Sequence, residues 1–116
     1  MKNLYYLKAI LHNNLAVSIS DADILFKHLK KEIIKKNVLD FTISLSGIEK
    51  LSYTFLKQFV KYIILEYNET FLKTHIHFID YKDEWEYLYD KAVKRVCMLK
   101  RQGRLRADFK KFYYKF

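Results

Sequence analysis

Apolar and polar residues recur along this chain with two different periods, which predict helices and strands in alternation. Helical spacing of apolar residues predicts three long helices. The first runs from Ser20, its predicted N-cap, to about Lys36, the second starts at about Tyr53, and the third opens at residues 80–83. The second is the most hydrophobic, and its wide apolar stripe predicts direct packing on a sheet.

Short apolar or alternating segments predict four strands between these helices, at residues 4–11, 15–19, 37–43 and 72–79. The resulting order of strands and helices predicts an α/β fold: a small mixed β-sheet of about four strands covered by about three helices. A chain of 116 residues is long enough for one hydrophobic core. Residues 1–102 are expected to form this domain.

The last segment, residues 103–116, is predicted to be a basic amphipathic C-terminal helix outside that domain. Gly103 is expected to end the preceding helix as a left-handed cap. Beyond it, apolar residues recur at intervals of four, three and four, at Leu105, Phe109, Phe112 and Phe116. This apolar face must be buried by the domain itself, by a second copy in a homodimer, or by another partner.

The net charge of +9 is concentrated at the same end of the chain, because residues 91–116 hold ten Lys/Arg and one acid. The candidate anion- or nucleic-acid-binding residues are Lys91, Lys94, Arg95, Arg101, Arg104, Arg106, Lys110 and Lys111. Cations neutralise phosphates, and the interleaved aromatic residues can stack on unpaired bases. The same pattern fits an anionic membrane surface, an acidic protein, or a helix that packs on its own domain with solvated lysines.

No residue spacing indicates catalysis, a cofactor or a metal site. His75 and His77 share a face of a predicted strand, but a zinc site needs a third ligand, which is not evident nearby. The single cysteine, Cys97, excludes an internal disulfide and is expected to pack. Because the apolar stretches are far shorter than roughly 20 residues, no transmembrane segment is expected, and the predicted location is cytoplasmic.

The middle of the chain contains a short hydrophobic motif. It consists of Val38-Leu39-Asp40-Phe41 followed by Ser46-Gly47-Ile48-Glu49-Lys50-Leu51-Ser52-Tyr53-Thr54-Phe55-Leu56. This motif resembles the STAS-like family of small bacterial and phage domains, and the resemblance covers roughly residues 4–97. It implies a mixed sheet covered by helices and a regulatory role through protein–protein contact.

The best-known relatives, anti-anti-sigma factors, bind a histidine-kinase-like ATPase that phosphorylates a serine at a helix start. By this resemblance the candidate phospho-acceptor or partner-docking residues are Ser52, Tyr53, Thr54 and Phe55. Tyr53 occupies the usual phosphoserine position, so only Ser52 and Thr54 are acceptors of the Ser/Thr type. A phosphate there would meet free backbone N–H groups and add about two negative charges. The alternative for Ser52 is helix capping.

The leading functional hypothesis is therefore a non-enzymatic, regulatory, protein-binding domain of STAS-like type. Its predicted contact surface is the turn at residues 52–55, extended by the basic end of the chain. The alternative is a small phage-type inhibitor that binds nucleic acid or a nucleoprotein through the basic C-terminal segment.

Overall fold

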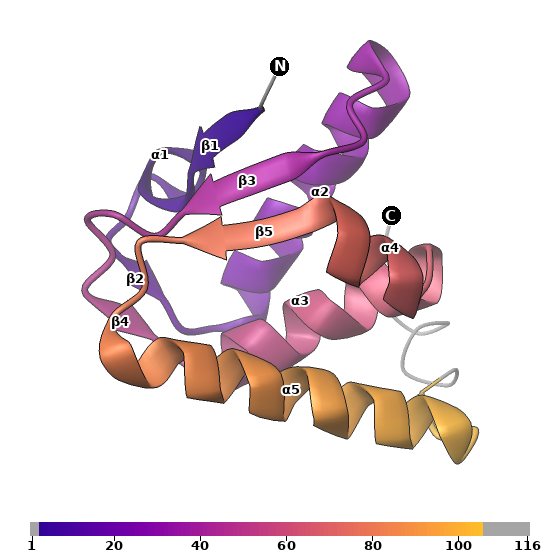
Figure 1. The fold of residues 1–116 in the computed structure, drawn as a ribbon. Coiled ribbons are helices and arrows are strands. Elements are labelled where there is room, and N and C mark those ends of the chain that lie inside the picture. The colour runs from indigo at the N-terminus through magenta and orange to yellow at the C-terminus, as the bar shows by residue number, and fades with distance from the viewer. Residues whose placement is uncertain (1–2, 106–116) are drawn as a thin grey trace.

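Strands and helices are interleaved along the chain, with two strands in succession at one point and two helices at another, and every described strand pairs with a parallel neighbour (Figure 1). The structure is a computed structural model that describes residues 3–105. Its elements are β1 (Leu4–Tyr6), α1 (Leu7–Leu11), β2 (Leu15–Ala16), α2 (Ile19–Lys36), β3 (Phe41–Ser44), β4 (Lys50–Leu51), α3 (Tyr53–Glu66), α4 (Glu69–His75), β5 (Ile76–Ile79) and α5 (Asp83–Arg101). The predicted α/β class is confirmed. The strands form two parallel sheets, β1-β3-β5 and β2-β4, in place of one mixed sheet.

One face of the three-stranded sheet is packed against helices. Side chains alternate between the two faces of a strand, and the register therefore places Tyr5, Ile43 and Phe78 in one inward-facing row. Ile43 and Phe78 are buried, and Tyr5 is half-buried. Alternate residues on the other side of the same strands form the outer face.

Helices α2, α3 and α5 all contact the inner face. Tyr5 meets His28 of α2 edge-on, with ring centroids 5.7 Å apart. Phe78 makes edge-on contacts with Phe59 of α3 at 5.8 Å and with Tyr89 of α5 at 5.3 Å. In Figure 1 the sheet lies at the top of the view and α5 crosses the bottom, with α3 between them.

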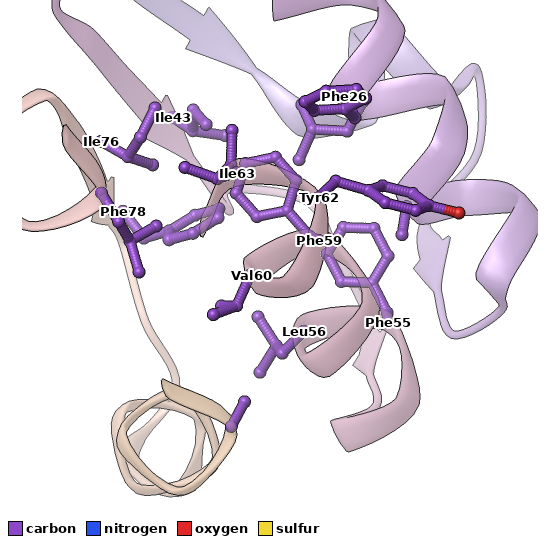
Figure 2. Close-up of a cluster of buried hydrophobic side chains, with 14 of the residues drawn as sticks. Phe26, Ile43, Phe55, Leu56, Phe59, Val60, Tyr62, Ile63, Ile76 and Phe78 are labelled. Atoms are coloured by element: carbon purple, nitrogen blue, oxygen red, sulfur yellow. The ribbon is translucent and has the colours of Figure 1, made fainter. Parts of the chain in front are cut away.

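Helix α3 is the centre of the hydrophobic core. Eight of its fourteen residues are buried, which means that the helix is covered on most of its circumference. Figure 2 shows its apolar side chains between Ile43, Ile76 and Phe78 of the strands and Phe26 of α2. The prediction that this helix packs directly on a sheet is confirmed.

Helix α5 ends at the glycine that the sequence indicates. Gly103 has a φ of 72°, in the left-handed region. Its N–H donates to Lys100 O, and the N–H of Arg104 donates to Leu99 O, which is the paired hydrogen-bond pattern of a Schellman motif. Leu105, just beyond, is 1% exposed and belongs to the same core as the domain. Phe109, Phe112 and Phe116 lie outside the described residues.

The prediction of one strand over residues 4–11 is wrong. Only Leu4–Tyr6 is extended, and Leu7–Leu11 forms the helix α1. Leu7 and Leu11 are both buried, and their spacing of four places them on one side of a single helical turn. His12 ends that turn in the left-handed conformation.

The start of α2 lies two residues before its prediction. Ser18, not Ser20, is the N-cap: its hydroxyl accepts from Asp21 N, and the Asp21 side chain accepts from Ser18 N. This capping box satisfies two helix-start N–H groups at once. The strand predicted at residues 15–19 is therefore limited to Leu15–Ala16. The predicted end at Lys36 is confirmed.

Two further strand predictions begin too early, because an asparagine sets a helix boundary nearby. Asn37 caps the end of α2 in the left-handed conformation, and β3 begins only at Phe41. Asn68 caps the start of α4 by accepting a hydrogen bond from Phe71 N at 2.6 Å. Residues 69–75 are therefore helical, and only Ile76–Ile79 forms a strand.

Candidate functional site

The hydroxyl of Ser52 is held by the domain on both of its hydrogen-bonding sides. It accepts from Phe55 N at 3.0 Å as the N-cap of α3, and it donates to Val17 O at 2.7 Å. The Ser52 N–H also donates to Ala16 O. The capping alternative for Ser52 is thus confirmed, and the residue joins β2 to the start of α3.

The other three residues of this turn differ in how they meet solvent. Thr54 is exposed, and Tyr53 is half-buried beneath Lys91, whose Nζ lies 5.3 Å from the ring centroid. Phe55 is 0% exposed and belongs to the core. Its side chain therefore cannot meet a partner while the domain is folded, and the solvent-facing part of the turn is limited to Thr54 and the edge of Tyr53.

Several predicted basic residues share the exposed side of α5. Lys91, Lys94, Arg95 and Arg101 are exposed, and so is Arg104 just after the helix. Within residues 3–105, none of Lys94, Arg95 and Arg101 makes an ion pair within 4.0 Å. Arg106, Lys110 and Lys111 lie outside the described residues.

The outer face of the three-stranded sheet is exposed along its two edge strands, and sequence analysis did not identify it. Its side chains are those of Leu4, Thr42 and His77 in one row, and of Tyr6, Ser44 and Ile79 in the next. On the central strand, Thr42 is half-buried and Ser44 is buried. Leu4 is 48% exposed, Tyr6 51% and Ile79 37%. In a strand, the side chains of Leu4-Tyr5-Tyr6 and of His77-Phe78-Ile79 point alternately to the two faces of the sheet. The sequence could therefore show which residues share a face, but not which face the helices cover.

The carboxyl ends of β1, β3 and β5 meet at one edge of this sheet, next to the outer face. There the buried Ser44 hydroxyl donates to the Asp80 carboxylate and accepts from Ser46 N. A hollow of about 630 Å³ next to Ser46 is lined mainly by residues 6–14, among them Tyr6 and Lys8. The carboxyl ends of parallel strands are the usual place for binding sites in α/β folds, so this edge extends the exposed surface.

His75, His77 and Cys97 have structural partners. His75 Nδ1 lies 2.8 Å from Asp40 Oδ1, and His77 Nε2 lies 2.9 Å from Thr74 O. Burial, followed by a hydrogen bond with Glu69, raises the pKa of the Cys97 thiol, which disfavours the reactive thiolate. Among the described residues, no three His, Cys, Asp or Glu side chains are grouped to hold a metal ion.

Comparison of the chain with protein-family models, curated proteins and solved structures finds no match. The resemblance to STAS-like domains therefore stays a prediction. Within residues 3–105, every helix is too short or too polar to cross a membrane.

Proposed function

We propose that this chain is a cytoplasmic, non-enzymatic regulatory domain of STAS-like type that works by binding another protein. The observation that carries the proposal is the uncovered outer face of the three-stranded sheet. Parallel sheets are usually covered on both faces. Here α2, α3 and α5 contact the inner face, whereas Leu4, Tyr6 and Ile79 on the outer face are exposed. A partner protein supplies the second cover.

The composition of the outer face supports a protein as the partner. Leu4, Tyr6 and Ile79 are exposed and apolar, and none of the six outward side chains is an Asp, Glu, Lys or Arg. A central patch without charge and with an aromatic residue is typical of protein–protein interfaces. Nucleic acid, by contrast, is bound through cations.

The turn at residues 52–54 has a secondary role in this proposal. The Ser52 hydroxyl donates to Val17 O and accepts from Phe55 N, so phosphorylation of Ser52 would remove the hydrogen bond to Val17 O. Thr54 is exposed at the first turn of α3. Thr54 is therefore the more accessible acceptor for a kinase-like partner.

The test places a photo-crosslinking amino acid at Tyr6 in the full chain, expressed in the native host. A matched control carries it at Ile24, which is 43% exposed on α2, the helix that contacts the inner face of the sheet. The expected result is one specific protein crosslinked from position 6 and not from position 24. Binding of that purified protein should then fall at least tenfold on Ile79→Asp and stay unchanged on Ile24→Asp.

Two results would overturn the proposal. One is crosslinking to the same proteins from both positions, which would indicate random contact. The other is unchanged affinity of the captured protein for Ile79→Asp, provided that circular dichroism shows the variant folded.

The exposed cations of α5 support nucleic-acid binding as a second candidate function. Lys94, Arg95 and Arg101 are all exposed, and Arg104 follows them. If they bind phosphates, affinity for a DNA or RNA oligomer should fall steeply with salt, and charge reversal at Arg101 and Arg104 should abolish it. Binding that does not respond to salt would remove this candidate.

A further inference from the structure

The exposed side of α5 carries acidic residues in its first half and basic residues in its second half. Asp83, Tyr87, Asp90, Lys94 and Arg101 are all exposed. They are spaced by three, four or seven residues, and so they form one stripe along the helix. The other side of α5 packs on the core through Trp85, Ala92 and Val96.

In this stripe, residues at equal distances on either side of the middle of the helix carry opposite charges. Asp90 and Lys94 each lie two residues from Ala92, and Asp83 and Arg101 each lie nine residues from it. A helix laid antiparallel on an identical helix, with the two Ala92 residues level, would bring each acid opposite a cation. Two Asp90–Lys94 pairs and two Asp83–Arg101 pairs would form at once.

The same arrangement places the exposed Tyr87 near the half-buried Met98 of the other copy. Tyr87 is 68% exposed, and the position symmetric to it, Cys97, is itself buried and lies next to Met98. A hollow of about 370 Å³ lies beside the stripe between α4 and α5, lined partly by Leu72, Ile76 and Val93. It offers apolar contact beside the stripe.

From this self-complementarity we infer that the exposed stripe of α5 is a docking surface for a second copy of this chain. The contact is isologous, since the same patch serves both copies. The ion pairs lie at the surface, where salt screens them, so the dimer is weak and forms best at low salt.

This inference goes beyond the proposed function and uses a different part of the molecule. In Figure 1 α5 lies at the opposite side of the domain from β1 and β3. A dimer formed through α5 therefore leaves both outer sheet faces accessible. It would present two partner-binding faces and bind a multivalent partner more tightly than one copy does.

The test uses two full-chain variants of opposite charge. Lys94→Glu with Arg101→Glu makes the stripe acidic throughout, and Asp83→Lys with Asp90→Lys makes it basic throughout. Each variant alone should sediment as a monomer of 14.2 kDa. An equimolar mixture at low salt should sediment at about twice that mass, and at about 1 M salt, where the screening length is about 3 Å, it should dissociate.

A matched control shows whether net charge alone explains the result. Lys31→Glu with Lys35→Glu makes the same charge change on the exposed side of α2. Mixed with the basic variant, it should leave that variant monomeric, although it still dimerises with itself through its unchanged α5 stripe. The single variants Asp90→Lys and Lys94→Glu, near the middle of α5, test the same pairing with less disturbance of the helix ends.

The inference fails if the wild-type chain is monomeric at low salt and high concentration, or if the mixture of opposite variants stays monomeric while both are folded. A mixed dimer that the basic variant forms equally well with the α2 control variant would also overturn it. Photo-crosslinking at Tyr6 is a separate measurement from sedimentation of the α5 variants. Failure of the dimer therefore does not affect the proposed protein-binding function, and failure of that function does not affect the dimer.

Discussion

Ser18 holds the start of α2 through two reciprocal hydrogen bonds with Asp21, so its hydroxyl is expected to contribute measurable stability. Ser18→Ala removes the cap and should lower the free energy of unfolding by about 1 kcal/mol. Ser20→Ala, inside the helix and exposed, should change it by less than about 0.5 kcal/mol. Urea denaturation of the two variants measures the difference, and equal effects would contradict the assignment of Ser18 as the cap.

A second residue-scale prediction concerns the pair formed by Tyr5 and Glu32. The Tyr5 hydroxyl donates to Glu32 Oε1 at 2.9 Å. This hydrogen bond is the main cause that lowers the pKa of Glu32 below its ordinary value of 4.5. Burial and the same contact raise the pKa of Tyr5 to about 12.

The sign of the pH dependence follows from these directions. A carboxyl with a lowered pKa adds stability above its unfolded-state pKa, and that stability is lost as the pH falls through the folded-state pKa. Tyr5→Phe should therefore raise the pKa of Glu32 and reduce the loss of stability below about pH 4.5. Carbon-13 NMR titration of the Glu32 carboxyl measures this pKa. An unchanged pKa of Glu32 in Tyr5→Phe would show that the Tyr5 hydroxyl does not stabilise the charged Glu32 carboxylate.

At the scale of elements, the end of α5 depends on one backbone conformation. A Cβ at Gly103 would meet no atom within 4 Å, so the effect of a substitution there comes from its φ of 72° alone. Gly103→Ala should cost about 1–2 kcal/mol, and Gly103→Asn less, because Asn adopts the left-handed conformation more readily. Thermal unfolding of the two variants checks this order. Equal melting temperatures would argue against a strained cap.

The long helices were predictable from the sequence, and the short elements were not. The stripes of α3 and α5 repeat over several turns, so their period is unambiguous. Helix α1 has five residues and β1 has three, which is too short for a period to show. There the structure is decided by which side chains the core buries, such as Leu7 and Leu11, and this depends on contacts with distant segments.

The candidate site was less predictable than the fold for a similar reason. The exposure of Lys94 and Arg101 follows from the helical pattern of α5 alone. The openness of the outer sheet face depends on all of α2, α3 and α5 packing on the same side of the sheet. The engagement of Ser52 depends on Val17, 35 residues earlier in the chain. Contacts between segments so far apart in the chain cannot be inferred from a local sequence pattern.

At the scale of the whole molecule, α3 contacts both neighbouring helices and the sheet, so opening it requires disruption of the core. Phe55, Phe59 and Val60 are 0% exposed. Amide hydrogens of α3 are therefore expected to exchange only through global unfolding, and those of the five-residue α1 much faster. Hydrogen-exchange NMR measures both. Faster exchange in α3 than in α2 or α5 would contradict this view of the core.

The parallel pairing of all described strands also has a consequence for how fast the chain folds. Between β1 and β3 lie residues 7–40, and between β3 and β5 lie residues 45–75. Each pairing must therefore close a long loop before it gains any contact, which slows folding.

The chain contains no proline, so no prolyl isomerisation delays refolding by tens of seconds. Stopped-flow refolding should show one exponential phase, and a phase of about 10–100 s would contradict it. The time to reach the native state is then set by the search for strand partners.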